Sequence, residues 1–155
     1  MNKIIKIGLI IGVIGIAIGG IAFLYVFNMP HRNVQAQQTD YTRTSSELVA
    51  EYLNNANAAN AKYLSDDGNS KIIKVTGTVA NISDDYNGQT VILIKETNDK
   101  AGVSATFTNE SKAHTTSINV GDIISVKGVI RSGATYDEDL ELYEHVVLDK
   151  SDIVK

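Results

Sequence analysis

The sequence predicts a mainly β protein: a small closed barrel of five strands, preceded by an α-helix and by an N-terminal transmembrane helix. Two strand-like runs, residues 74–79 and 125–130, alternate in the same way around a central glycine and indicate the barrel. A run without charged residues, 7–27, indicates the membrane helix. The predicted parts are a transmembrane anchor (1–30), a linker (31–43) and a barrel domain (44–155) that begins with its own helix (44–64).

Composition restricts the function classes. After Pro30 the chain has 12 basic and 18 acidic residues. A domain that grips phosphate backbones requires clustered Lys and Arg, so this balance argues against nucleic acid as a partner. The chain has no cysteine, which excludes disulfides, thiolate catalysis, zinc–sulfur sites and lipoprotein attachment. The barrel must therefore be held together by its apolar core.

The charge-free run from Ile7 to Phe27 is long enough to cross a hydrocarbon core of about 30 Å as a helix. Lys3 and Lys6 precede it, so the N-terminus is expected to stay in the cytoplasm and the barrel to be exported. This predicts a single-pass protein of the inner (cytoplasmic) membrane with an extracytoplasmic C-terminal domain. A cleaved signal peptide is the alternative, because residues 34–36 have the small residues that a cleavage after Ala36 requires.

Small residues recur within this predicted membrane helix. The spacing of four, three and four residues aligns them on one helical face, which permits close pairing of two helices. The sequence thus offers a face for a homodimer, formed by Gly8, Gly12, Gly15 and Gly19.

The polar segment 31–43 shows no apolar period and is interpreted as a linker. Thr44 and Glu47 then have the spacing of a capping box, which predicts the start of a helix. Apolar residues recur every three to four positions as far as Tyr63, and turn formers begin at Ser65. One helix is therefore expected from 44 to 64.

Five strands are expected after this helix. Asn87-Gly88 is a strong hairpin signal between the first two, and a turn of helix is expected near residues 110–112. An isolated glycine within a strand signals a bulge or a sharp bend, and a glycine opens the turn into the fourth strand. These structural glycines are Gly77, Gly121 and Gly128. Three strands, a short helical link and two strands is the order of an OB-fold, although other small barrels fit as well. The predicted strands are 71–82, 90–96, 102–108, 123–132 and 139–148.

Three sequence features carry a family resemblance: the alanine-rich helix end 59–63, the run 75–79 and the run 120–128. With the closing strand, residues 48–150 resemble the tRNA-anticodon-like OB-fold family of membrane-anchored or exported bacterial proteins. The resemblance implies an OB-fold, and its motifs are structural. Members of that family often carry two cysteines, at positions that match Ala105 and His145 here. Both cysteines are missing from this chain, so the resemblance does not imply a redox role for it.

OB barrels usually bind ligands on the face of their second and third strands, flanked by the loops after strands one and four. In this sequence the corresponding candidates are Tyr86, Lys95, Thr106 and Tyr136. One lysine with two or three rings is a small platform for a nucleic acid strand. We therefore expect a binding or scaffolding module for a protein or a glycan, with a single-stranded nucleic-acid-binding domain as the alternative.

No catalytic constellation is evident in the sequence. His31, His114 and His145 have no serine or aspartate at a spacing that indicates a triad. The acidic residues 84–85 and 137–139 fall in predicted loops, where turn formation explains them. We expect no enzyme activity, no cofactor and no metal site.

Overall fold

The structure is a computed structural model that describes residues 15–25 and 33–154. The chain divides into two compact units, and the boundary in the sequence lies after Arg32. In the first unit, residues 15–25 are helical. The remainder of the predicted membrane helix, with Gly8 and Gly12, lies outside the described residues. Among the residues that are described, no helix combines the length and apolarity needed to cross a membrane.

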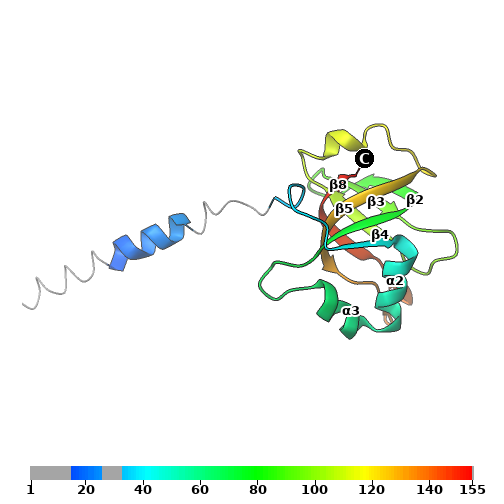
Figure 1. The fold of residues 1–155 in the computed structure, drawn as a ribbon, viewed down its shortest axis with the longest axis horizontal. Coiled ribbons are helices and arrows are strands. Elements are labelled where there is room, and N and C mark those ends of the chain that lie inside the picture. The colour runs from blue at the N-terminus through cyan, green and yellow to red at the C-terminus, as the bar shows by residue number, and fades with distance from the viewer. Residues whose placement is uncertain (1–14, 26–32, 155) are drawn as a thin grey trace, which may run out of the picture. The chain divides into compact units, whose positions relative to one another are not determined.

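The second unit contains the predicted barrel, which is confirmed. Its strands hydrogen-bond in the circular order β2, β3, β4, β8, β5 and back to β2, so the sheet closes on itself. All neighbours are antiparallel except β4 and β8, which are parallel. Figure 1 shows the barrel with the two helices α2 and α3 together on one side of it. The strands are β2 (Ile72–Asp84), β3 (Thr90–Ile94), β4 (Val103–Phe107), β5 (Ile123–Ser132) and β8 (Val146–Ile153).

The barrel interior is filled by alternate residues of each strand, as expected when one face of a closed sheet is dry. Phe107, the last residue of β4, is fully buried. Two of the three structural glycines lie where a side chain would collide with the interior. A Cβ on Gly77 would lie 2.5 Å from Ser45 Oγ, and one on Gly128 would lie 2.8 Å from Ser151 Oγ. The register shift of β2 falls between Val79 and Asn81, so the bulge expected at Gly77 is absent there.

The helical segment differs from the prediction. The expected single helix 44–64 is two helices, α2 (Ser45–Asn54) and α3 (Ala56–Tyr63). The capping box that starts α2 is confirmed, because Thr44 Oγ1 accepts from Glu47 N and Thr44 N donates to Glu47 Oε2. Asn55 causes the break: its backbone is extended, and its Oδ1 accepts a hydrogen bond from Ala58 N at 3.0 Å. A side-chain acceptor that caps a new helix competes with continuation of the old one.

The segment 31–43 is folded from Asn33 onward, which corrects its interpretation as a linker. Strand β1 (Tyr41–Thr44) pairs in parallel with β2. Asp40 exchanges two hydrogen bonds with the backbone of Ile72, one from its own N and one to its Oδ2. Val34 is 2% exposed, and Gln35 Nε2 donates to the carbonyl of Lys150 at 2.5 Å. These partners are distant in sequence, so no local pattern could reveal them.

The closing strand also differs. The expected strand 139–148 is a short strand β7 (Leu142–Glu144) followed by β8, and β7 pairs with β6 (Thr135–Asp137). Asp137 Oδ1 accepts from the backbone N of Asp139 and of Leu140, which turns the chain where a strand was expected. Between β4 and β5 the expected helical turn is a 3₁₀ helix, η1 (Lys112–Thr115). The β6–β7 hairpin forms a separate two-stranded sheet and takes no part in the barrel sheet.

Candidate functional site

The outer face of β3 and β4 is the surface on which the sequence places the ligand. Its half-exposed side chains form two cross-strand pairs, Val91 with Thr106 and Leu93 with Ser104. These four side chains are aliphatic or hydroxyl-bearing. The two cross-strand pairs themselves therefore offer neither a ring for stacking nor a charge for a phosphate.

The four predicted site residues are not brought together on this face. Thr106 lies on it, but Tyr86 lies in the loop that precedes β3 and Lys95 directly follows β3. A strand of five residues spans roughly 16 Å, which separates the two ends. Tyr136 lies on β6, outside the barrel sheet. The four predicted residues therefore do not share one surface.

A hollow of about 330 Å³ lies between the helices and the β6–β7 hairpin. Tyr136 and Tyr143 occupy opposite positions on the hairpin, and their ring centroids are 4.8 Å apart at an interplanar angle of 50°. Lys100 Nζ lies 5.3 Å from the centroid of Tyr143, within cation–π range. The volume is at the lower end of the range for small-molecule sites, about the size for one or two rings. The lining residues are Tyr52, Leu53, Ala56, Lys100, Ala134, Thr135, Tyr136 and Tyr143.

The lining of this hollow differs electrostatically from the domain as a whole. Lys100 is its one formally charged residue, and no lining residue is a carboxylate. In the part of the chain that the structure describes, no carboxylate lies within ion-pair distance of Lys100. An ammonium group beside a tyrosine ring, with no carboxylate partner, suits a ligand that joins an aromatic ring to one negative charge.

Tyr52 forms the wall of the hollow on the α2 side. Its side chain is 2% exposed, and within the described residues its hydroxyl is buried without a hydrogen-bond partner. Burial, with smaller contributions from Tyr63 and Glu51, raises the pKa of Tyr52 to about 12. The hydroxyl therefore keeps its proton and remains a hydrogen-bond donor. Gly133 permits this packing, because a Cβ at that position would lie 2.0 Å from the Tyr52 ring.

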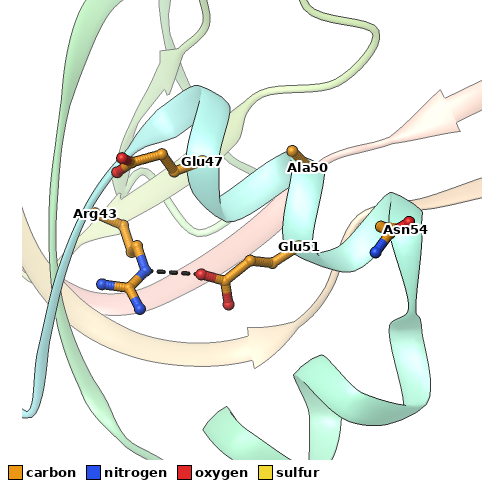
Figure 2. A pocket seen from close by; sticks show the side chains of 5 residues that line it. All are labelled: Arg43, Glu47, Ala50, Glu51 and Asn54. Atoms are coloured by element: carbon orange, nitrogen blue, oxygen red, sulfur yellow. Dashed lines mark hydrogen bonds and ion pairs between the residues drawn. The ribbon is translucent and has the colours of Figure 1, made fainter.

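A second hollow, of about 550 Å³, lies beside α2 and is lined by Arg43, Glu47, Ala50, Glu51 and Asn54. Figure 2 shows Arg43 reaching toward Glu51 across it. Arg43 Nε donates to Glu51 Oε1 at 2.8 Å, and Lys62 Nζ donates to Oε2 at 2.7 Å.

The Tyr63 hydroxyl donates to the same Oε2 at 2.6 Å. Burial opposes the ionisation of Glu51, but the bonds from Lys62, Tyr63 and Arg43 outweigh it and lower its pKa to about 2. The charges here compensate one another and join β1, α2 and α3. This cluster is thus a structural clasp.

The histidines show no catalytic arrangement among the described residues. His145 Nδ1 accepts from Gly102 N at 3.1 Å, and burial, followed by the charge of Lys95, lowers the pKa of His145. His114 Nδ1 lies 2.6 Å from Asp152 Oδ1 on the surface. Ala105 pairs with Leu148, three residues beyond His145, so the two family cysteine positions are not opposite each other here. Within the described ranges, no three His, Cys, Asp or Glu side chains gather as metal ligands.

Sequence reasoning identified Tyr136 but missed Tyr143, Lys100 and Tyr52. A signal for Tyr143 was available: residues 137–139 are turn formers, and a hairpin around them places positions 136 and 143 opposite each other. Tyr52 lies on the apolar stripe of the helix and is indistinguishable in sequence from a core residue. Lys100 lies in a turn, where its neighbours depend on the tertiary fold.

The closed barrel and its ligand-sized hollow define an OB-fold binding domain. The model of the family described as tRNA_anti-like matches residues 1–138, so the chain belongs to that family. A similar solved structure is a crystal structure from Klebsiella pneumoniae subsp. pneumoniae, whose protein is named a "putative nucleic acid-binding lipoprotein". The two chains share 16% identity with a TM-score of 0.53, over 82% of this chain and 100% of that one. A search of curated proteins gives no significant match.

Proposed function

We propose that this protein is a membrane-tethered OB-fold module of the cell envelope that binds a short stretch of single-stranded nucleic acid in the hollow between α2 and the β6–β7 hairpin. The observation that carries the proposal is the lining of the hollow. It combines the rings of Tyr136 and Tyr143 with an uncompensated Lys100 and contains no carboxylate. Membership of the tRNA_anti-like family and the name of the Klebsiella protein support the ligand class.

The charge of the whole domain limits how such a ligand binds. An acidic domain offers no continuous positive groove, so a long strand gains little from counterion release. One stacked base contributes about 1–3 kcal/mol, which is independent of net charge. We therefore assign binding chiefly to stacking in the hollow, with phosphate contacts from Lys100 and from Lys95, which lies near His145. This resolves the conflict between an acidic sequence and an anionic ligand.

The envelope placement rests on two supports. The charge-free run 7–27, preceded by Lys3 and Lys6, favours a tether with a cytoplasmic N-terminus. The Klebsiella protein is named a lipoprotein, a class that is anchored in membranes. We further propose a non-enzymatic role, because the described part of the hollow contains no pair of nucleophile and base.

Fluorescence polarisation with a labelled ten-nucleotide thymidine strand tests the ligand class. Single-strand affinity falls with a log–log slope of about −0.7 per phosphate contact. Two contacts, from Lys95 and Lys100, predict a loss of about 25-fold between 20 and 200 mM salt by the same relation. Lys100→Gln is expected to reduce this loss to about fivefold.

Lys112→Gln is the matched control, because Lys112 contacts Asp84 and Gly88 near the Tyr86 loop at the other end of β3. It removes one positive charge and should leave the 25-fold loss unchanged. Absence of binding at 20 mM salt would contradict the proposal, and so would an affinity that does not respond to salt.

A neutral glycan is the second candidate ligand. The rings of Tyr136 and Tyr143 combine an apolar face with a polar hydroxyl group, which suits a sugar as well as a base. A glycan would bind with an affinity that does not depend on salt. Competition against the labelled strand by a neutral oligosaccharide, such as a chitin trimer, separates this candidate from the first.

A further inference from the structure

His145 joins the two segments that carry the charged wall and one aromatic wall of the hollow. Its ring Nδ1 accepts a hydrogen bond from Gly102 N at 3.1 Å, and Val146 N donates to the carbonyl of Gly102 at 3.0 Å. Gly102 follows Lys100 by two residues in the connection between β3 and β4. His145 follows Tyr143 by two residues, between β7 and β8. The cation–π contact of Lys100 with Tyr143 therefore spans the same two segments that these hydrogen bonds tie together.

The amide of Gly102 lies in a crowded part of the barrel wall. Gly102 is buried, and a Cβ there would lie 2.7 Å from the carbonyl oxygen of Ile94 and 2.8 Å from Lys95 Cβ. A buried amide that loses its acceptor is unfavourable. The placement of this connection therefore depends on whether His145 can accept the hydrogen bond.

The protonation state of His145 decides whether it accepts. A ring nitrogen of histidine accepts a hydrogen bond only when it carries no proton, so the ring that bonds Gly102 is neutral and has its proton on Nε2. Protonation of Nδ1 makes it a donor, and two N–H groups then face each other. Burial, followed by the charge of Lys95, lowers the pKa of His145 from its ordinary value of 6.5. The neutral form is therefore the form of the folded protein at neutral pH, and the change falls below pH 6.5.

The surroundings of His145 do not stabilise a positive charge. Lys95 repels one, and both carboxylates of the β3–β4 connection already accept hydrogen bonds from other residues. Within the described ranges, no carboxylate lies within ion-pair distance of His145. The charged groups on the connection, on β6 and on β7 are Lys95, Glu96, Asp99, Lys100, Asp137 and Glu144.

We infer that His145 is a positioning residue for the hollow: its neutral ring holds the Lys100 segment beside Tyr143, and protonation of the ring releases this segment and weakens ligand binding. This inference rests on the proposed function and adds regulation by pH to it. His145 acts through Gly102 and needs no contact with the ligand.

Protonation also adds a positive charge near Lys95, and this change has the opposite effect on an anionic ligand. A partly exposed charge is screened at a salt concentration of about 0.15 M. The loss of a buried hydrogen bond is not screened, so it dominates. Strand binding therefore weakens at acid pH, whereas the added charge alone would strengthen it. The sign of the pH dependence distinguishes the two effects.

Fluorescence polarisation with the full-length protein in detergent and the labelled ten-nucleotide thymidine strand tests the inference at pH 7.5 and at pH 5, with salt held at about 0.15 M. Neither thymine nor a phosphodiester group changes its charge between these pH values. The wild type should bind about tenfold more weakly at pH 5.

His145→Asn and His145→Ala form a matched pair of variants. The amide oxygen of Asn can accept the hydrogen bond from Gly102 and does not titrate, so His145→Asn should bind equally well at both pH values. His145→Ala lacks the acceptor and should bind weakly at both. His114→Asn is the control, because His114 pairs with Asp152 on the surface, and it should keep the pH dependence of the wild type.

Backbone amide NMR of the ligand-free protein provides a second measurement. The signals of Lys100, Gly102 and Tyr143 should shift together between pH 7.5 and pH 5, with one pKa below 6.5, and these shifts should be absent in His145→Asn.

The results separate the inference from the proposed function. Strand affinity that rises at pH 5, or that falls equally in the wild type and in His145→Asn, would overturn the inference and leave nucleic-acid binding intact. Signals of Lys100 and Tyr143 that stay fixed while Gly102 shifts would also overturn it. If the strand binds at neither pH, the proposed function is wrong, and the NMR titration still decides whether His145 holds the two segments together.

Discussion

Replacing Glu51 by glutamine tests whether the clasp of β1, α2 and α3 stabilises the domain. Glu51 accepts hydrogen bonds from Arg43, Lys62 and Tyr63. Glu51→Gln keeps the shape of the side chain and removes its charge. The two cations then lose their common partner, so the variant should be less stable than the wild type at neutral pH.

The size of the effect follows from the pKa of Glu51, which is lowered from 4.5 to about 2. At 1.36 kcal/mol per pKa unit, this gives an upper limit of about 3 kcal/mol. The Glu51 side chain is 32% exposed, so water screens the pairs and a contribution of about 1–2 kcal/mol is more realistic. A carboxyl group whose pKa is lowered on folding stabilises the folded state at pH values above its ordinary pKa of 4.5. This stabilisation is lost as the pH falls from about 4.5 toward about 2.

Urea unfolding of the wild type and of Glu51→Gln at pH 7 and at pH 2.5 measures this contribution. With a urea m-value of about 2 kcal/mol/M, the variant midpoint should fall by about 0.5–1 M at pH 7. The difference should shrink by more than half at pH 2.5. Glu138→Gln, at an exposed position in the hairpin loop, is the control and should shift the midpoint little. Equal stability of wild type and Glu51→Gln at pH 7, or a difference that does not depend on pH, would refute the reasoning.

Three further predictions concern packing and the N-terminal segment. Gly133→Ala forces a Cβ into the Tyr52 ring and should cost about 1–3 kcal/mol in thermal unfolding, whereas Gly88→Ala, in open space at φ +74°, should cost about 1 kcal/mol. Val34→Ala should cost about 1–2 kcal/mol, and unchanged stability would argue that the segment does not pack as described. Because residues 33–37 belong to the folded domain, intact mass spectrometry of membrane-extracted protein should show no cleavage after Ala36. A mature chain that starts at Gln37 would contradict this prediction.

The sequence predicts the barrel well because its determinants are local. Alternating β-branched residues, the Asn87-Gly88 turn and the Thr44–Glu47 capping box each act over a few residues. These features place four of the five barrel strands and the start of the helical segment within a few positions of the structure. The glycines at 77, 121 and 128 could also be singled out, although the reason for two of them is close packing of distant atoms.

The errors have a common physical origin in contacts between distant parts of the chain. The pairing of β1 with β2 and the burial of Val34 involve partners more than thirty residues away, and a short polar strand carries little local signal. The hollow is assembled from α2, the turn after β3 and the β6–β7 hairpin. Tyr136 could be predicted as a candidate because an exposed tyrosine in a loop is conspicuous. Tyr143 could have been found only by recognising the hairpin around residues 137–139, and Lys100 could not be predicted, because its neighbours depend on the tertiary fold.

The most direct test of the account is to map where the ligand binds. Backbone amide NMR shifts of the full-length protein in detergent micelles, recorded while the ten-nucleotide thymidine strand is added, report each residue separately. The account predicts that the largest changes fall on Lys100, Tyr136 and Tyr143, with small changes at Val91 and Thr106. Changes concentrated on the outer face of β3 and β4, or around Arg43, would contradict it.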